Sequence, residues 1–112
     1  MKTVLMIDRE EHDRSLVSAL EGEGLRVIVE ADSGDGLTRA VAELPGAIIM
    51  DEDMPALDNA DLLPALRRST GSLIIVKGSG EGVAETQALE NGADFYLPRG
   101  AGAQEFLGFF IA

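Results

Sequence analysis

The chain has 112 residues, of which 46% are hydrophobic and 26% charged, so it fits one globular domain with a single core. Twenty acidic residues against nine basic ones give a formal net charge of −11. This charge argues against direct binding to nucleic acid, because a phosphate backbone requires clustered Lys and Arg. The sequence contains no cysteine, which excludes a disulfide framework and a thiolate metal site.

Apolar runs of strand length recur along the chain, and each is followed by a segment with helical spacing. The N-terminal run is too short for a signal peptide, and no stretch could span a bilayer, so we expect a cytoplasmic protein without a membrane contact. The predicted strands are 3–8, 25–31, 47–51, 72–77 and 93–98. The predicted helical segments are 10–24, 33–45, 59–71, 82–92 and 101–112.

Three of these runs are continuously apolar, which indicates burial on both faces and therefore a parallel sheet covered by helices. The runs are 4–7, 47–50 and 73–76. Five strands that alternate with helices predict a doubly wound α/β domain over residues 1–112. The last segment is short and unusually apolar, so it either packs across the sheet or exposes an adhesive surface.

Residues within the helical segments give finer predictions. Leu16 and Leu20 are expected to share one buried face, and Leu37, Val41 and Leu44 another. Pro64 is expected either in the first turn of its helix or at a kink. Glycines near the helix ends are candidates for left-handed backbone, namely Gly22, Gly24, Gly46, Gly71 and Gly92.

Charged residues stand at four of the five predicted strand ends, although the strand interiors are almost free of charge. In open parallel sheets, ligands gather beyond the carboxyl ends of the strands, so we expect these side chains to converge at one edge. They are Asp8, Arg9, Asp51, Asp53, Lys77 and Arg99.

Other patterns are better explained by local structure. KGSGEG at 77–82 has its Lys before the glycines, which is the reverse of a Walker A loop, so we interpret it as a flexible loop. DSGDG at 32–36 lacks the later Glu of a calcium loop and predicts a helix cap and turn. His12 is the only histidine and is expected on the surface, so no Ser/His/Asp or Cys/His nucleophile can be assembled. We therefore expect no catalysis by such a nucleophile.

Taken together, VLMIDRE, IIMDEDMP, SLIIVKGSGE and NGADFYLPRG resemble four motifs of the receiver domains of bacterial two-component response regulators. The resemblance covers nearly the whole chain and implies a flavodoxin-like sheet with strand order 2-1-3-4-5. It places Asp51 at the phosphoacceptor position and Asp8 at the first of two acidic positions. It also matches the backbone carbonyl of Asp53 to a metal ligand, and Tyr96 to an aromatic residue that moves inward on activation.

Three positions depart from the family pattern. Arg9 replaces the second acid, which in the family binds Mg²⁺. Lys77 stands where the family has Thr or Ser, and Arg99–Gly100 replaces Lys–Pro, whose peptide bond is commonly cis. Without proline a cis bond costs roughly 3 kcal/mol, so a trans bond is expected here.

The substitution at position 9 argues against Mg²⁺ binding, because a guanidinium group supplies no lone pair and repels the ion. Arg9 could instead extend into solvent, with Glu10 as a partial substitute. The leading hypothesis is a pseudo-receiver in which Arg9, Lys77 and Arg99 replace the metal charge and Asp51 is paired with one of these cations. Such a domain would bind a sensor kinase, an output protein or a second copy through the fourth helix, fifth strand and fifth helix.

Two alternatives remain from the sequence. The chain could be a working receiver that a histidine kinase phosphorylates on Asp51. Its activity would then be at most that of a phosphoacceptor and autophosphatase, and we expect no other enzyme activity. It could also be a flavodoxin-like domain that binds an anionic metabolite through Lys77 and Arg99. Either a stand-alone regulator or a piece of a larger one fits the length.

Overall fold

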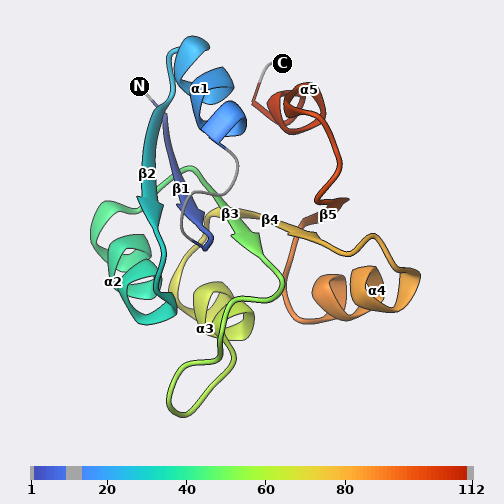
Figure 1. Ribbon diagram of the computed structural model, residues 1–112. Coiled ribbons are helices and arrows are strands. Elements are labelled where there is room, and N and C mark those ends of the chain that lie inside the picture. The colour runs from blue at the N-terminus through green and yellow to red at the C-terminus, as the bar shows by residue number, and fades with distance from the viewer. Residues whose placement is uncertain (1, 10–13, 111–112) are drawn as a thin grey trace.

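Five parallel strands form the centre of the computed structural model, which describes residues 2–9 and 14–110. Their order is β2-β1-β3-β4-β5, and Figure 1 shows the helices on both sides of this sheet. The strands are β1 (Thr3–Ile7), β2 (Arg26–Glu30), β3 (Ala47–Asp51), β4 (Leu73–Gly78) and β5 (Phe95–Pro98). The helices are α1 (Arg14–Gly22), α2 (Ser33–Glu43), α3 (Leu62–Ser69), α4 (Gly82–Glu90) and α5 (Ala103–Leu107). The predicted α/β class and strand order are confirmed.

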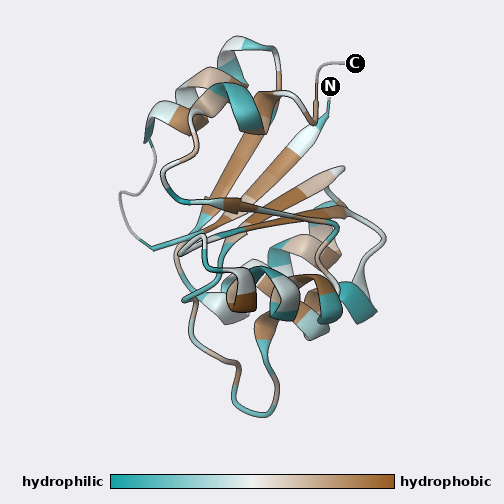
Figure 2. Ribbon diagram, turned by 90° about the vertical axis from the view of Figure 1, so that its right-hand side faces the viewer, coloured by the Kyte–Doolittle hydropathy of each residue, from teal (hydrophilic) through white to brown (hydrophobic). Residues whose placement is uncertain are grey.

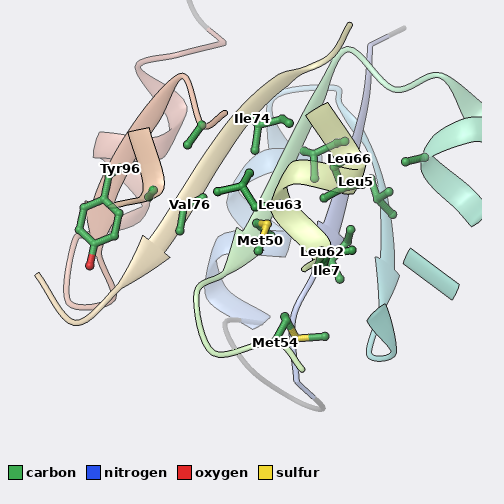
Figure 3. Close-up of a cluster of buried hydrophobic side chains, with 14 of the residues drawn as sticks. Leu5, Ile7, Met50, Met54, Leu62, Leu63, Leu66, Ile74, Val76 and Tyr96 are labelled. Carbon is green, nitrogen blue, oxygen red and sulfur yellow. The ribbon is translucent and has the colours of Figure 1, made fainter. Parts of the chain in front are cut away.

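Each face of the sheet has its own hydrophobic core. Helices α2, α3 and α4 cover one face, where Leu5, Met50 and Val76 belong to the first core cluster (Figure 3). Helices α1 and α5 cover the other face, where Met6 and Ile49 belong to the second cluster. In Figure 2 the brown strands lie between these two helical layers. Because successive side chains of a strand point to opposite faces, strands buried on both sides must be apolar throughout, as the sequence predicted.

Helix α2 packs through its smallest residues, which corrects the predicted face. Val41 is 52% exposed and Leu44 72% exposed, while Leu37 is only partly buried. The buried positions are Ser33, Gly36 and Ala40. A Cβ added at Gly36 would lie 2.8–2.9 Å from side-chain carbons of Ile7, so the helix approaches the sheet too closely for a larger residue.

The helix ends also differ from the glycine prediction. Left-handed backbone occurs at Gly24 and Gly92, as predicted, but α2 ends with Leu44 in this region (φ 46°). Gly22 is the last residue of α1, and the residue that caps the end of α3 is Thr70, in extended backbone. Among the described residues, Gly46 and Gly71 do not have positive φ. Local helix spacing did not reveal these ends because each depends on where the chain must turn toward the next strand.

Several local predictions are confirmed. Leu16 and Leu20 are both buried, and Pro64 is the third residue of α3 and therefore lies in its first turn. The Asp32 side chain caps α2 by accepting a hydrogen bond from the Asp35 N–H at 2.9 Å. No peptide bond in the described part of the chain is cis, as expected for Arg99–Gly100.

The C-terminal segment packs across the sheet rather than exposing all its apolar residues. Phe106 and Leu107 are buried against the second core cluster, and Phe109 and Phe110 are partly buried there. The predictions that concern Glu10 and His12 lie outside the described residues, as do the last two residues of the C-terminal segment.

Candidate functional site

The charged strand-end residues converge at the carboxyl edge of the sheet because they share one side of it. Four of them stand two positions after a residue that faces α1 and α5, so strand alternation directs them to the same side. The pairs are Met6 with Asp8, Ile49 with Asp51, Ile75 with Lys77, and Leu97 with Arg99. We call Asp8, Arg9, Asp51, Asp53, Lys77 and Arg99 the strand-end cluster.

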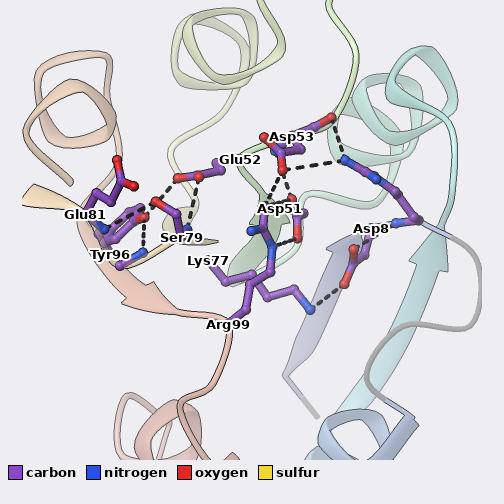
Figure 4. Close-up of polar contacts among 11 residues, drawn as sticks. Asp8, Asp51, Glu52, Asp53, Lys77, Ser79, Glu81, Tyr96 and Arg99 are labelled. Carbon is purple, nitrogen blue, oxygen red and sulfur yellow. Dashed lines mark hydrogen bonds and ion pairs between the residues drawn. The ribbon is translucent and has the colours of Figure 1, made fainter. Parts of the chain in front are cut away.

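Asp51 is 6% exposed at the end of β3, and Arg99 binds its carboxylate with two parallel hydrogen bonds. The Arg99 Nε donates to Oδ2 at 2.8 Å, and Nη2 donates to Oδ1 at 2.8 Å (Figure 4). The backbone N–H of Asp53 also donates to Oδ1, at 2.8 Å. Both oxygens at the phosphoacceptor position are therefore occupied by donors from the chain itself, in the bidentate geometry that favours arginine.

These contacts determine the charge state of Asp51. Burial by itself raises the pKa of the carboxyl group, but the hydrogen bonds from Arg99 and the Asp53 N–H, with the charges of Arg99 and Lys77, outweigh burial and lower it. The hydrogen bonds to Asp51 in turn raise the pKa of Arg99 above its ordinary value. The pair is thus fully ionised at neutral pH.

Lys77 and Asp8 form a second ion pair, deeper in the sheet edge. The Lys77 side chain is 4% exposed and that of Asp8 2% exposed, and Nζ contacts Asp8 Oδ2. The other oxygen of Asp8 accepts a hydrogen bond from the Arg9 N–H at 2.8 Å. Because Lys77 is aligned with Asp51 in the sheet register, its charge also acts on Asp51.

Arg9 and Asp53 complete the strand-end cluster at its exposed rim. The Arg9 guanidinium lies 3.5 Å from the backbone carbonyl oxygen of Asp53 and 3.6 Å from its carboxylate. Arg99 also donates to the Asp53 carboxylate at 2.7 Å. Three carboxylates thus face three cations, so the cluster is electrically balanced by residues of the chain.

The donor set does not fit Mg²⁺. This ion requires near-octahedral oxygen ligands, and the oxygens that the resemblance assigned to it have cationic neighbours. Asp8 faces Lys77, and the Asp53 carbonyl faces Arg9. Among the described residues, no group of three or more acidic or histidine side chains is arranged to hold a metal ion.

Tyr96 lies apart from this cluster, on the side of the sheet that α3 and α4 cover. The residue is 9% exposed, and its hydroxyl donates to the Glu52 carboxylate at 2.9 Å. Sequence reasoning assigned no role to Glu52. The sequence signal for Glu52 is that it follows Met50 by two positions and therefore lies on the same side of the sheet. Met50 belongs to the same core cluster as Tyr96.

The comparisons with known proteins agree with this fold. No family model matches the chain. The chain is 36% identical over 110 residues to the transcriptional regulatory protein KdpE of Mycobacterium tuberculosis, a match that covers 96% of this chain and 48% of the relative. It is 33% identical over 107 residues to the KDP operon transcriptional regulatory protein KdpE of Escherichia coli, covering 94% and 48%. The chain therefore spans about half the length of these curated relatives.

Solved structures of response regulators superpose on the whole chain. The signal receiver domain of the putative response regulator NarL from Mycobacterium tuberculosis has a TM-score of 0.82 and 25% identity, and the match covers 97% of this chain and 91% of that one. A response regulator from Burkholderia pseudomallei, solved with a phosphorylated aspartic acid, a calcium ion and citrate, has a TM-score of 0.84 and 26% identity over 96% and 65%. The chain belongs to the receiver domains of the response regulators of two-component signalling. In the described part of the chain, no helix is long and apolar enough to span a membrane.

Proposed function

We propose that this chain is a pseudo-receiver, a receiver domain that acts by binding a protein partner without Mg²⁺-dependent phosphorylation of Asp51. The observation that supports this proposal most strongly is the bidentate contact between Arg99 and both oxygens of Asp51. Phosphoryl transfer to a carboxylate requires an oxygen that can approach phosphorus and cations that bind the transferring group. Here the oxygens of Asp51 and the guanidinium group of Arg99 are already bonded to each other.

The balance of charges supports the same proposal. In a working receiver the metal relieves repulsion between neighbouring carboxylates, whereas here Lys77, Arg99 and Arg9 have that role permanently. Two unit charges about 4 Å apart interact by roughly 4 kcal/mol at an effective dielectric constant of 20. A dication beside Arg9 would meet repulsion of this order, which is large enough to weaken binding by orders of magnitude.

We propose that the partner binds the face formed by α4, β5 and α5. Three of its apolar side chains are exposed, with Val83 at 69%, Leu89 at 44% and Phe95 at 42%. The ring of Phe95 packs against that of Phe109, with 4.5 Å between the centroids. A sensor kinase, an output protein or a second copy of the chain could cover this surface, and no catalysis by the chain is needed.

A second candidate is a working receiver phosphorylated on Asp51 by a histidine kinase. The exposure of the Arg99 side chain, at 40%, favours it, because the guanidinium could leave Asp51 without breaking the core. Binding of an anionic metabolite through Lys77 and Arg99 has less support. Both side chains are engaged by carboxylates, so an anion would have to displace Asp8 or Asp51.

The decisive experiment is incubation with acetyl phosphate and Mg²⁺, followed by intact-protein mass spectrometry. We expect no added phosphoryl group, while a receiver domain with both acidic residues gains one under the same conditions. A one-phosphoryl mass shift that disappears in Asp51→Asn would refute the pseudo-receiver proposal and establish the second candidate.

A further inference from the structure

A second polar network joins Tyr96 of β5 to residues just after β3 and β4, on the side opposite to the strand-end cluster. Tyr96 donates its hydroxyl hydrogen to Glu52 Oε1 at 2.9 Å, and the N–H of Gly80 donates to the Tyr96 oxygen at 3.0 Å. The N–H of Ser79 donates to Glu52 Oε2 at 3.0 Å. Figure 4 shows these contacts as a group separate from those of Asp51. We call Glu52, Ser79, Gly80 and Tyr96 the Glu52 network.

Strand alternation separates the two groups. Glu52 follows Met50 by two positions, and both Met50 and Tyr96 belong to the core cluster beneath α3 and α4. Asp51 points to the other side, where Arg99 holds it. Within the part of the chain that the structure describes, the carboxylates of Glu52 and Asp51 have different hydrogen-bond partners, although the two residues are adjacent in sequence.

The backbone of β4 is built around this network. A Cβ added at Gly78 would overlap the Glu52 carboxylate and lie 2.6 Å from the Tyr96 hydroxyl oxygen. Gly80 has a φ of 89°, a conformation in which its N–H reaches Tyr96 and which other residues rarely adopt. Two glycines thus bring the turn between β4 and α4 close to the acid and the phenol.

We propose that Glu52 is a positioning residue that holds Tyr96 and the turn at 79–81 inward, independently of Asp51. The carboxylate accepts from both the phenol and a backbone N–H, and hydrogen bonds to a charged acceptor are the stronger kind. If Tyr96 moved outward, Glu52 would lose a donor and the Gly80 N–H would lose its acceptor. The arrangement of the turn before α4 is therefore set from within the chain.

This inference rests on the proposed function only in one respect, namely that a partner recognises the face beside this turn. Phe95 on that face precedes Tyr96 in β5, and strand alternation directs the two side chains to opposite sides of the sheet. A β5 strand that Tyr96 anchors through Glu52 therefore presents Phe95 from a fixed position. In the pseudo-receiver, the partner would bind a surface whose conformation Glu52 maintains, and no phosphoryl group on Asp51 would be needed.

The sequence supplies a clean probe, since Tyr96 is the only tyrosine and the chain has no tryptophan. Tyrosine emission of the whole protein therefore reports on this one hydroxyl, and backbone amide exchange by NMR reports on Ser79 and Gly80. In Glu52→Ala we expect altered tyrosine emission and exchange at both amides that is faster by about tenfold. In Tyr96→Phe we expect faster exchange at Gly80, with the ring still packed.

The matched control is Asp51→Asn, which alters the neighbouring carboxylate on the other side of the sheet. It should leave tyrosine emission unchanged. The exchange of Ser79 and Gly80 should rise no more than that of the core amides, which report the change in global stability. The proposal is overturned if Glu52→Ala and Tyr96→Phe leave these amides as protected as before, or if Asp51→Asn exposes them equally. If Glu52→Ala fails to fold, Glu52→Gln and Tyr96→Phe decide the question by the same exchange rates. The phosphorylation assay has no bearing on these rates, so either proposal can fail alone.

Discussion

Lys77 on β4 forms a buried ion pair with Asp8 at the end of β1, although β3 lies between these two strands. The contact is possible because Lys77 has a long side chain on the same side of the sheet as Asp8, and it reaches past the end of β3. It links the carboxyl edges of β1 and β4 across β3. A hydroxyl residue at position 77 would be too short for this contact.

We predict that Lys77→Met destabilises the fold by about 3–5 kcal/mol, because it leaves Asp8 buried without its cation. The double variant Asp8→Asn/Lys77→Met should be markedly more stable than Lys77→Met, since it removes the stranded charge. Urea unfolding of the wild type and the variants measures both differences. Equal stability of the single and double variants would mean that the buried charge of Asp8 does not depend on Lys77.

The Asp51–Arg99 pair should give stability a defined dependence on pH. The pKa of the Asp51 carboxyl group is lowered in the folded state. The stabilisation is therefore complete above the pKa of an unfolded aspartate, about 4, and is lost as the pH falls through the pKa that Asp51 has in the folded protein. We expect Asp51→Asn to cost about 1–3 kcal/mol at pH 7 and progressively less below pH 4. Unfolding of both proteins across this range tests the sign. A variant that is more stable than the wild type at pH 7 would instead indicate unrelieved repulsion among the carboxylates.

Gly36 provides a test of the packing between α2 and the sheet. Gly36→Ala would place a methyl group against Ile7, and we expect a loss of about 1–3 kcal/mol from overpacking. The matched control is Gly22→Ala in α1, which meets nothing within 4 Å. The control should be neutral or stabilising by up to about 1 kcal/mol, because alanine has the higher helix propensity. Thermal or urea unfolding measures the change in stability of each variant. Equal changes in the two variants would contradict this account.

Arg9 offers a way to recover metal binding. In Arg9→Asp, a cation beside the Asp53 carbonyl is exchanged for a potential oxygen ligand next to Asp8. We expect Mg²⁺ to raise the melting temperature of this variant in a concentration-dependent manner while the wild type stays unchanged. Arg9→Gln is the control, since it removes the positive charge without adding a carboxylate. A wild type that Mg²⁺ stabilises as strongly as Arg9→Asp would show that Arg9 is no obstacle to the ion.

The fold was predictable because its signals are local and repeated. Continuously apolar strands such as 47–51 and 73–76 require cover on both faces, and a parallel sheet with alternating helices is the arrangement that provides it. The buried face of α2 was not predictable in the same way. Gly36 and Ala40 are small enough for α2 to approach β1 closely, so they face the sheet and the larger residues Val41 and Leu44 are exposed. The spacing of the apolar residues alone therefore indicated the wrong face.

The sequence by itself determined which charged residues meet at the edge of the sheet. Strand alternation places Asp8, Asp51, Lys77 and Arg99 on one side, and parallel strands bring their carboxyl ends together. Only the tertiary structure decided the pairing, in which Lys77 binds Asp8 and Arg99 binds Asp51 and Asp53. It also revealed Glu52 as the partner of Tyr96. The physical reason is that alternation fixes the side of the sheet for each residue, whereas side-chain length and the path of the turns fix which atoms come within hydrogen-bonding distance.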